Sequence, residues 1–260
     1  MLTISIITVC YNSSKTILDT IKSVNLQSYK YIEHVFIDGL STDNTKEIIR
    51  LNSKKTNLII SEEDSGLYDA INKGVLNATG DIIALLHSDD IFSSSEIISD
   101  LMEKIQNENL DGVYGDLLYV DKINTDKIIR FWKSCEFTPT LLREGWMPAH
   151  PTLILKKEVY LKYGVFDKSF KIAADYDFML RIFKDSNLKF GYLPKVVNKM
   201  RVGGASNRNL KNIIKKSKED YRAIRSNNIG GFTTLILKNT SKIKQFFNKK
   251  IWFTIKLKIK

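Results

Sequence analysis

Apolar runs alternate with amphipathic segments along the first hundred residues of the chain. The runs are rich in Ile, Val and Leu and predict strands at residues 2–9, 33–37, 57–60 and 80–86. Apolar residues at helical spacing between these runs predict helices at residues 14–27, 45–51 and 67–77. Strands that alternate with helices in this way are typical of βαβ units, which form a parallel sheet.

The second half of the chain is less regular. Its patterns predict strands at residues 112–119 and 128–132, and helices at residues 93–102, 158–163 and 176–183. A length of 260 residues, 43% of them hydrophobic, fits one α/β domain of generous size. We expect one body that ends near Gly204, followed by a tail.

The positive charge of the chain is concentrated in this tail. The formal net charge is +11, but residues 208–260 hold 15 Lys or Arg against only Glu219 and Asp220, a net of +13. The rest carries 25 basic and 27 acidic residues, a net of −2, and offers no second basic face for nucleic acid. Lys mixed with bulky apolar residues suits an anionic membrane surface, and a docked terminal helix with a solvated lysine face is the alternative.

The cysteines and the apolar runs bear on the compartment. Cys10 and Cys135 form no disulfide framework, which favours a reducing cytosol. No run has the length of a membrane-spanning helix, and the first eleven residues lack the basic start of a signal peptide. We therefore expect a cytoplasmic protein.

Two adjacent carboxylates, Asp89 and Asp90, follow the apolar run at residues 80–86. A buried parallel strand has its carboxyl end at the crevice where open α/β sheets bind ligands. Two carboxylates there repel each other, and a divalent cation that carries a diphosphate would hold both of them ionised. Either Asp could instead cap the helix predicted after them, and the segment alone leaves both interpretations open.

Eight short segments between residues 4 and 206 carry a family resemblance. They are IITVCYN at 6–12, FIDGLSTDNT at 36–45, EEDSGLYDAINKG at 62–74, LHSDD at 86–90, YGD at 114–116, HPT at 150–152, AADYD at 173–177 and RVGGAS at 201–206. In this order they resemble the family-2 glycosyltransferases, which are inverting enzymes of the GT-A fold. Within that family the chain is similar to the branch that builds bacterial surface polysaccharides such as lipopolysaccharide, O-antigen or capsule.

The resemblance implies a GT-A fold, which is a Rossmann-like, mostly parallel central sheet flanked by helices. It would cover residues 1–206, with a donor-binding half to about residue 118 and an acceptor half at about residues 119–206. Residues 207–260 lie outside the resemblance as a basic amphipathic helical tail.

The ends of the first two strands are expected to meet the base of a nucleotide. A base can pack on the backbone and on the aromatic ring where the first strand ends at Thr8, Tyr11 and Asn12, although Asn12 could simply cap the strand. Asp38 ends the second strand, and the resemblance assigns it to base recognition. Many relatives carry a second acid where this chain has Gly39, so the identity of the base stays open.

The next two segments would meet the rest of the donor. The resemblance places Asp69 and Asn72 near the nucleotide or the sugar, and a loop and helix that only pack under the sheet are the alternative. The resemblance also implies that Asp90 is the direct ligand of Mg²⁺ or Mn²⁺. Asp89 would then contact the ribose or a metal-bound water.

Asp175 is the candidate for the chemistry. It lies at the start of a predicted helix, where the positive end of the helix dipole keeps a carboxylate ionised and able to accept a proton. In the family the matching Asp is the general base. There are two alternatives: Asp175 could be only the N-cap of the helix, or Asp177 could be the base. Ala174 stands where relatives often carry Glu.

Two further side chains are candidates for donor or acceptor contacts. His150, between Pro148 and Pro151, could bind donor phosphate or acceptor hydroxyls, or could be structural. Arg201 opens a segment that resembles a loop closing over the diphosphate. The three His residues stand at positions 34, 87 and 150, none near this loop, so the metal would rest on Asp90, the diphosphate and water.

Together these features imply a metal-dependent hexosyltransferase that moves a sugar from a UDP-, GDP- or dTDP-sugar to a hydroxyl of a lipid-linked saccharide. The basic tail would hold the enzyme at the inner face of the cytoplasmic membrane. A nucleotidyltransferase acting on sugar phosphates is one alternative, but residues 8–14 lack the basic, Gly-rich loop that it needs. A non-enzymatic protein that binds nucleic acid or a membrane is the other.

Overall fold

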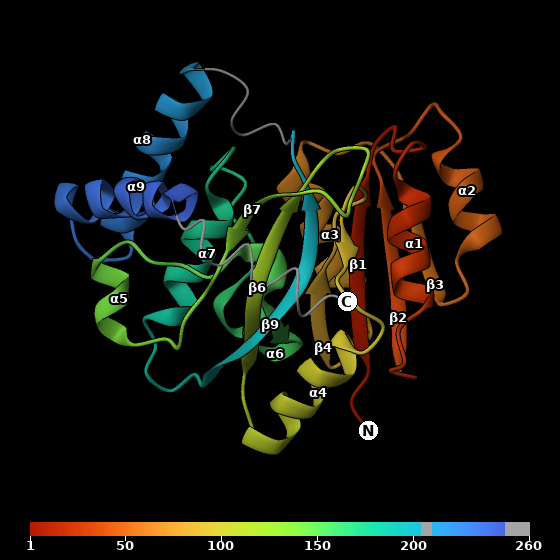
Figure 1. Ribbon diagram of the computed structural model, residues 1–260, viewed down its shortest axis with the longest axis horizontal. Helices are drawn as coiled ribbons and strands as arrows, with labels where there is room; N and C mark the ends of the chain where they lie inside the picture. The colour runs from red at the N-terminus through yellow and green to blue at the C-terminus, as the bar shows by residue number, and fades with distance from the viewer. Residues whose placement is uncertain (204–209, 248–260) are drawn as a thin grey trace.

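The computed structural model of the protein describes residues 1–203 and 210–247, which form a nine-stranded sheet with helices on both faces (Figure 1). The strands are β1 (Ile4–Cys10), β2 (Ile32–Asp38), β3 (Thr56–Ser61), β4 (Ile82–Leu85), β5 (Ile91–Phe92), β6 (Gly112–Val120), β7 (Ile128–Trp132), β8 (Ile154–Lys156) and β9 (Phe190–Arg201). The helices are α1 (Ile17–Asn25), α2 (Thr45–Asn52), α3 (Leu67–Asn77), α4 (Ile97–Glu108), α5 (Pro139–Arg143), α6 (Lys157–Tyr163), α7 (Ala174–Phe183), α8 (Leu210–Ser226) and α9 (Phe232–Phe247), with a 3-10 turn, η1 (His150–Thr152).

The directions of the strands bring several loops to one edge of the sheet. The strand order is β3-β2-β1-β4-β8-β6-β9-β5, with β7 beside β6. Strands β1 to β4 are parallel, β8 is antiparallel to both β4 and β6, and β9 is parallel to β6. The carboxyl ends of β1, β2, β4, β6 and β9 therefore lie at the same edge, which we call the carboxyl edge; it is at the top of Figure 1.

Helices cover both faces of the sheet, which explains why the central strands are apolar along their whole length. Helices α1, α2 and α4 pack on one face, and α3, α6 and α7 pack on the other. Every residue of β1 and β2 is buried, as expected for parallel strands with two covered faces. A Cβ atom on Gly74 would lie 2.3 Å from Ile7 Cγ2, so α3 can lie directly against β1 only because residue 74 is Gly.

The expected α/β fold is confirmed, and the differences concern elements with weak patterns. The helix at 67–77 and the strand at 128–132 have the predicted bounds, and the other predicted elements occur with shifted ends. The helix expected at 93–102 begins four residues later, at Ile97. The patterns did not predict α5, the short strands β5 and β8, or β9, the longest strand.

Helices α8 and α9 pack on the body of the protein. Ala223 and Ile224 of α8 and Leu235 of α9 belong to the same apolar core as α7. A Cβ atom on Gly145 would lie 2.5 Å from Lys238 Cβ, so α9 lies directly against the loop after α5. The described part of the tail is therefore docked.

Some expectations for the tail lie outside this description. Residues 248–260, which include Trp252, are outside the described residues, as are the side chains of Phe246 and Phe247. The expected division at residue 206 falls between residues 203 and 210 and stays a prediction. None of the described helices is long and apolar enough to cross a membrane.

Candidate active site

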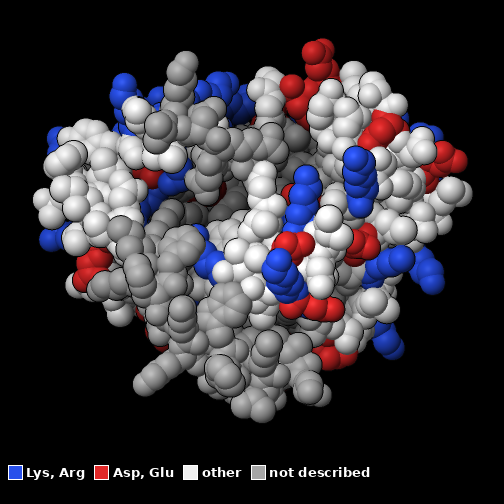
Figure 2. All heavy atoms as spheres, turned by 45° about the horizontal axis from the view of Figure 1, so that its top comes forward, with Lys and Arg blue, Asp and Glu red and all other residues white. Residues whose placement is uncertain are grey.

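The candidate site is built from loops at the carboxyl edge of the sheet. The loops after β1, β2 and β4 carry Tyr11, Gly39 and the segment at residues 87–90, and β9 ends there at Arg201. Figure 2 brings this edge toward the viewer, and the face is hollowed near its middle. Ligand sites in open α/β sheets lie at this edge because the loops there are free to differ while the strands hold them in place.

Asn12 joins the loop after β1 to the loop after β2. Its backbone is left-handed, with a φ of 48°, which Asn tolerates better than most residues. Its Oδ1 accepts hydrogen bonds from the backbone of Thr42 (2.9 Å) and Asp43 (3.4 Å), and its own N–H donates to Ser41 Oγ at 2.9 Å. The neighbouring Tyr11 is 65% exposed, and its contact with a base stays a prediction.

Thr8 and Asp38 are fully buried, and their side chains bond within the protein. Thr8 Oγ1 lies 2.9 Å from Nε2 of His34, inside the sheet. Asp38 Oδ2 accepts from Ser41 N (3.1 Å) and Ser61 Oγ (2.7 Å), so this carboxylate anchors the loop after β2. Contact of either side chain with a donor stays a prediction.

A side chain at position 39 would lie in close contact with Asp64. A Cβ atom at position 39 would lie 3.0 Å from Asp64 Oδ2 and 3.6 Å from Tyr11 Cδ2. Asp64 Oδ1 in turn binds Lys73 Nζ at 2.8 Å. The place where relatives often carry a second acid is therefore bordered by the carboxylate of Asp64.

Asp69 and Asn72, both on α3, hold the segment that leads toward α7. Asp69 binds Lys168 Nζ and the Ser65 N–H, at 2.8 and 3.0 Å, and these hydrogen bonds lower the pKa of the Asp69 carboxyl to about 2. The Asn72 amide donates to the carbonyl of Phe166 (2.8 Å) and accepts from its N–H (2.9 Å). The Asn72 amide is thus engaged by the protein backbone.

The acid pair behaves as two different groups. Asp89 is half-buried, whereas Asp90 is 1% exposed and accepts a hydrogen bond from the Arg201 N–H at 3.3 Å. Its second oxygen, Oδ2, is buried without a hydrogen-bond partner. Burial and the charge of Asp89 raise the pKa of Asp90 well above its usual value, so this carboxylate is short of positive charge.

Arg201 ties together the segments around the acid pair. Its guanidinium donates to Asp19 Oδ2 (2.6 Å), to the carbonyl of Asp89 (2.7 Å) and to the carbonyl of Lys122 (3.1 Å). The side chain is 6% exposed. Residues 204–206 of the loop that was expected to close over a diphosphate lie outside the described residues.

The buried Oδ2 of Asp90, which has no hydrogen-bond partner, shows how a divalent metal could fit this site. An unpartnered buried carboxylate oxygen is a suitable ligand for Mg²⁺ or Mn²⁺. Within residues 1–203 and 210–247, no group of three or more His, Cys, Asp or Glu could hold a metal by itself. The residues present fit an ion that takes most of its ligands from a bound diphosphate and water.

Asp175 lies in the first turn of α7, beside two His residues. Its Oδ1 lies 3.2 Å from the hydroxyl of Tyr68, which also donates to the Ile172 carbonyl at 2.7 Å. Burial lowers the pKa of His150 to about 4 although the charge of Asp175 opposes this, and burial lowers the pKa of His87 in the same way. Both imidazoles are therefore neutral at pH 7, so His150 can share a hydrogen bond but brings no positive charge to a phosphate.

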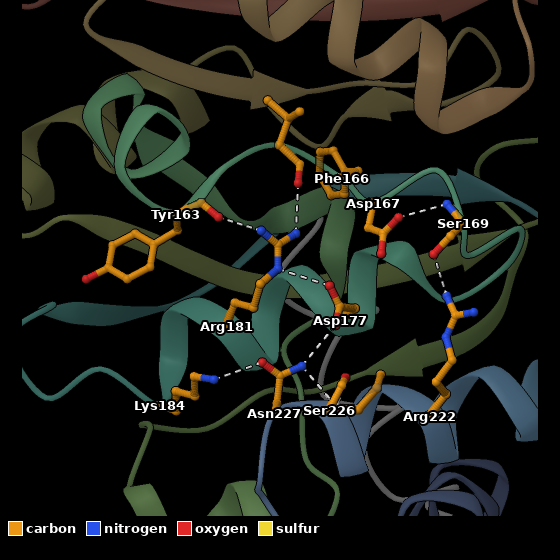
Figure 3. Close-up of polar contacts among 12 residues, drawn as sticks. Tyr163, Phe166, Asp167, Ser169, Asp177, Arg181, Lys184, Arg222, Ser226 and Asn227 are labelled. Carbon is orange, nitrogen blue, oxygen red and sulfur yellow. Dashed lines mark hydrogen bonds and ion pairs between the residues drawn. The ribbon is translucent and has the colours of Figure 1, made fainter.

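Asp177, the alternative base, is occupied by structural contacts. Its Oδ2 binds Arg181 Nε at 3.0 Å, and its Oδ1 accepts from Asn227 Nδ2 at 2.9 Å (Figure 3). Arg181 also donates to the carbonyls of Tyr163 and Val165, at 2.5 and 2.8 Å. Both oxygens of Asp177 are thus bound, by Arg181 of α7 and by Asn227 just after α8, whereas Asp175 is only half-buried.

The patterns missed several aromatic and basic side chains of the site. Tyr119 on β6 interacts electrostatically with both Asp90 and Asp175, which help burial to raise its pKa. The guanidinium of Arg130 on β7 lies 4.8 Å from the centre of the Tyr119 ring. Tyr68 and His87 stand inside two of the segments that carry the family resemblance, so their position in those segments was the available signal.

Comparisons with known proteins agree with this arrangement. The profile of the family described as glycosyl transferase family 2 matches residues 5–155. An uncharacterized glycosyltransferase of Mycobacterium tuberculosis is 30% identical over 184 residues, which cover 69% of this chain and 68% of that protein. A PGL/p-HBAD biosynthesis glycosyltransferase of Mycobacterium bovis is 27% identical over 208 residues, 78% of each protein.

The family profile and these relatives define the class of the protein as a glycosyltransferase. The chain belongs to glycosyl transferase family 2, and the expected family is confirmed.

Solved structures share the fold at low sequence identity. TarS 1–349 of S. aureus, in complex with UDP-GlcNAc, matches with a TM-score of 0.69 at 19% identity over 87% of this chain and 65% of that one. The mannosyltransferase PcManGT of Pyrobaculum calidifontis, in complex with GDP-Man and Mn²⁺, matches with a TM-score of 0.62 at 18% identity over 86% and 64%. This chain thus spans less than two thirds of the length of these structures. Their likeness confirms the expected GT-A fold.

Proposed function

We propose that this protein is an inverting glycosyltransferase that moves a sugar from a nucleoside diphosphate sugar to an acceptor hydroxyl, with Asp175 as the general base. The observation that carries the proposal is the position of the Asp175 carboxylate. It is half-buried at the start of α7, touches the Tyr68 hydroxyl at 3.2 Å, and lies in the electrostatic field of the site beside His87 and His150.

The chemistry follows from one proton transfer and one displacement. The Asp175 carboxylate takes the proton of the acceptor hydroxyl as its oxygen forms a bond to the anomeric carbon of the sugar. The bond from that carbon to the diphosphate oxygen breaks, and the configuration inverts. Tyr68 donates at the shorter distance to Ile172, at 2.7 Å, so the Asp175 carboxylate keeps its capacity to accept a proton.

The donor would lie across the loops after β1, β2 and β4. In this proposal the base stacks on Tyr11 and is read near Asp38, while Asp89 contacts the ribose or a metal-bound water. Asp90 would hold Mg²⁺ or Mn²⁺, which would offset the negative charge that develops on the leaving diphosphate. The complexes of TarS with UDP-GlcNAc and of PcManGT with GDP-Man and Mn²⁺ support a UDP- or GDP-sugar as donor, and a dTDP-sugar is the further candidate from the sequence.

The proposal for the acceptor and for the location of the enzyme is based on the surface of α8 and α9. Exposed apolar side chains on α8 and α9 include Ile213, Ile214, Phe232, Ile236 and Leu237. Figure 2 shows Lys and Arg side chains gathered at the upper left, where α8 lies. Such a mixture favours an anionic membrane surface, so we propose a lipid-linked saccharide acceptor in surface-polysaccharide synthesis at the inner face of the cytoplasmic membrane.

A donor screen followed by one substitution tests the enzymatic proposal. UDP-, GDP- and dTDP-sugars with Mn²⁺ are screened by thermal shift, and release of the nucleoside diphosphate is then measured with the best donor. Asp175→Asn should slow transfer by about 10²-fold or more and leave donor affinity unchanged. The matched control is Asp100→Asn, which removes a carboxylate that pairs with Lys195 on the outer surface.

Two results would reject this assignment. Transfer by Asp175→Asn at a rate near that of the wild type would exclude Asp175 as the base. Release of pyrophosphate from a nucleoside triphosphate, without turnover of any nucleotide sugar, would indicate a nucleotidyltransferase.

Sedimentation with vesicles of acidic lipids tests the membrane proposal. Because α9 is docked, substitution of exposed side chains is cleaner than truncation, and Phe232→Ser with Ile236→Ser should release the protein from the vesicles. Binding should also weaken at high salt, since surface charges are screened over about 10 Å at 0.1 M. Equal pelleting of the variant and the wild type at both salt concentrations would remove the membrane hypothesis.

A further inference from the structure

The carboxylate of Glu219, on α8, binds the backbone that leads into Asp175. Its Oε2 accepts from the N–H groups of Ile172 (2.8 Å) and Ala173 (3.0 Å), and its Oε1 accepts from the N–H of Lys171 (3.1 Å). The side chain of Glu219 is 9% exposed. One buried carboxylate thus satisfies three consecutive N–H groups that end two residues before Asp175.

The same backbone is held from the opposite side by α3. The Ile172 carbonyl accepts from the Tyr68 hydroxyl at 2.7 Å, and that hydroxyl also lies 3.2 Å from Asp175 Oδ1. Ile172 is therefore fixed at its N–H by α8 and at its carbonyl by α3. Its position sets where α7 begins and where the Asp175 carboxylate points.

Helix α7 has no side-chain cap of its own. Its N-cap residue is Ala173, which offers no hydrogen-bond acceptor in its side chain. Glu219 supplies a negative charge and acceptor oxygens at this end from another helix, which is also favourable toward the positive end of the helix dipole. The start of α7 thus depends on a residue 46 positions later in the chain.

Other contacts hold α8 against residues 169–177, and they fix the helix that carries Glu219. Arg222 Nη2 donates to Ser169 Oγ at 2.7 Å, and the Arg222 guanidinium lies 3.6 Å from the centre of the Phe170 ring. Asn227 Nδ2 donates to Asp177 Oδ1, and Asn227 Oδ1 accepts from Lys184 Nζ at 3.0 Å (Figure 3). Glu219 is therefore part of a continuous interface between α8 and α7.

We propose that Glu219 is a positioning residue for the base Asp175; the proposal rests on the proposed function of Asp175. A catalytic base must lie within hydrogen-bond reach of the proton that it takes, and an error of about 1 Å can cost 10²-fold in rate. Loss of the Glu219 carboxylate leaves three N–H groups at residues 171–173 without their acceptor. The segment then shifts, and the start of α7 shifts with it.

Hydrogen–deuterium exchange tests the contact without any substrate. The amides of residues 171–173 should exchange at least about 10-fold faster in Glu219→Gln and Glu219→Ala than in the wild type, because their acceptor is altered or lost. Gln keeps one oxygen acceptor, so its effect should be the smaller of the two. The matched control is Glu158→Gln, which alters an exposed carboxylate on α6 and should leave these amides unchanged. Unchanged exchange in both Glu219 variants would overturn the proposal.

Steady-state kinetics of the full-length protein test the link to Asp175. Glu219→Gln should lower kcat by about 10-fold or more, with the KM for the donor unchanged, when assayed well below its melting temperature. In an Asp175→Asn background the same substitution should lower the residual rate by less than about twofold, because the misplaced base is already absent. A merely structural role would lower the rate equally in both backgrounds, and this outcome would overturn the proposal. If the wild type turns over no nucleotide sugar, the proposed function fails, and the exchange experiment still decides whether Glu219 holds the segment.

Discussion

Replacement of Asp220 by Asn would remove the counter-ion of a buried ammonium group at the junction of three helices. Lys238 Nζ on α9 lies 2.5 Å from Asp220 Oδ1 on α8, and neither side chain is more than 2% exposed. Lys216 Nζ lies 3.0 Å from Asp220 Oδ2. Burial tends to raise the pKa of Asp220, but Lys238 and Lys216 outweigh it and hold the pKa below its usual value. The pair is therefore charged in the folded protein at neutral pH.

The expected cost follows from the burial of the ammonium group. Removing one partner of a buried ion pair typically costs about 3–5 kcal/mol. We expect about 3 kcal/mol, because the Tyr176 ring lies 3.5 Å from Lys238 Nζ and keeps a favourable cation–π contact. For a domain of this size, that loss corresponds to a decrease in Tm of about 6–12 °C.

Thermal unfolding of four variants measures this prediction. Asp220→Asn should be the least stable, because it leaves a buried charge, and Lys238→Met should lose less because Asp220 keeps Lys216. The double variant, Asp220→Asn with Lys238→Met, should recover most of the loss. Lys218→Met, which alters an exposed lysine on α8, is the control and should stay within about 0.5 kcal/mol of the wild type. If Asp220→Asn melts at the temperature of Lys218→Met, α9 is not docked through this pair.

Three further predictions concern other parts of the fold and the site. Burial lowers the pKa of His34 to about 3, so below pH 6.5 the unfolded chain binds a proton that the folded protein does not. Lowering the pH from 6.5 to 5 should therefore reduce the free energy of unfolding by about 2 kcal/mol through this group. In urea titrations, the stability of His34→Gln should depend less on pH than that of the wild type, and an equal pH dependence would contradict the prediction. Asn72→Ala leaves the buried backbone of Phe166 without two hydrogen bonds and should cost about 2–3 kcal/mol in urea unfolding, whereas the exposed Asn77→Ala should be nearly neutral. Asp90→Ala should abolish the increase in donor affinity that Mn²⁺ produces in calorimetry while the protein stays folded, and an undiminished metal effect would reject Asp90 as the ligand.

Elements with a strong local period could be predicted from the sequence, and elements that depend on a distant partner could not. Helix α3 and strand β7 have the predicted bounds because their patterns are local. Strand β9 has a mixed burial pattern with Pro194 and Lys195 in its middle, and its pairing with β6 shifts register around Asp116. Its extended structure comes from the ladder with β6, which no local pattern encodes.

The site divides in the same way. The short motifs brought Asp90 and Asp175 to attention because each follows or begins an element with a clear pattern. The same motifs suggested ligand contacts for Asn72 and Arg201, which stay predictions. What no motif indicated is that their side chains bond to Phe166, 94 residues away, and to Asp19, 182 residues away. A motif names a residue type at a position, whereas its hydrogen-bond partner depends on which chain segment packs beside it.

By itself the sequence determined the α/β class, the family and the two candidate acids Asp90 and Asp175, since periodicity and short motifs are local properties of a chain. Only the tertiary structure decided that α8 and α9 pack against the body. Glu219 and Asp220 are the only two acids at positions 208–260, and a buried acid needs partners that the sequence does not show. Their partners, the backbone before Asp175 and the ammonium of Lys238, come together only when α7, α8 and α9 pack against one another.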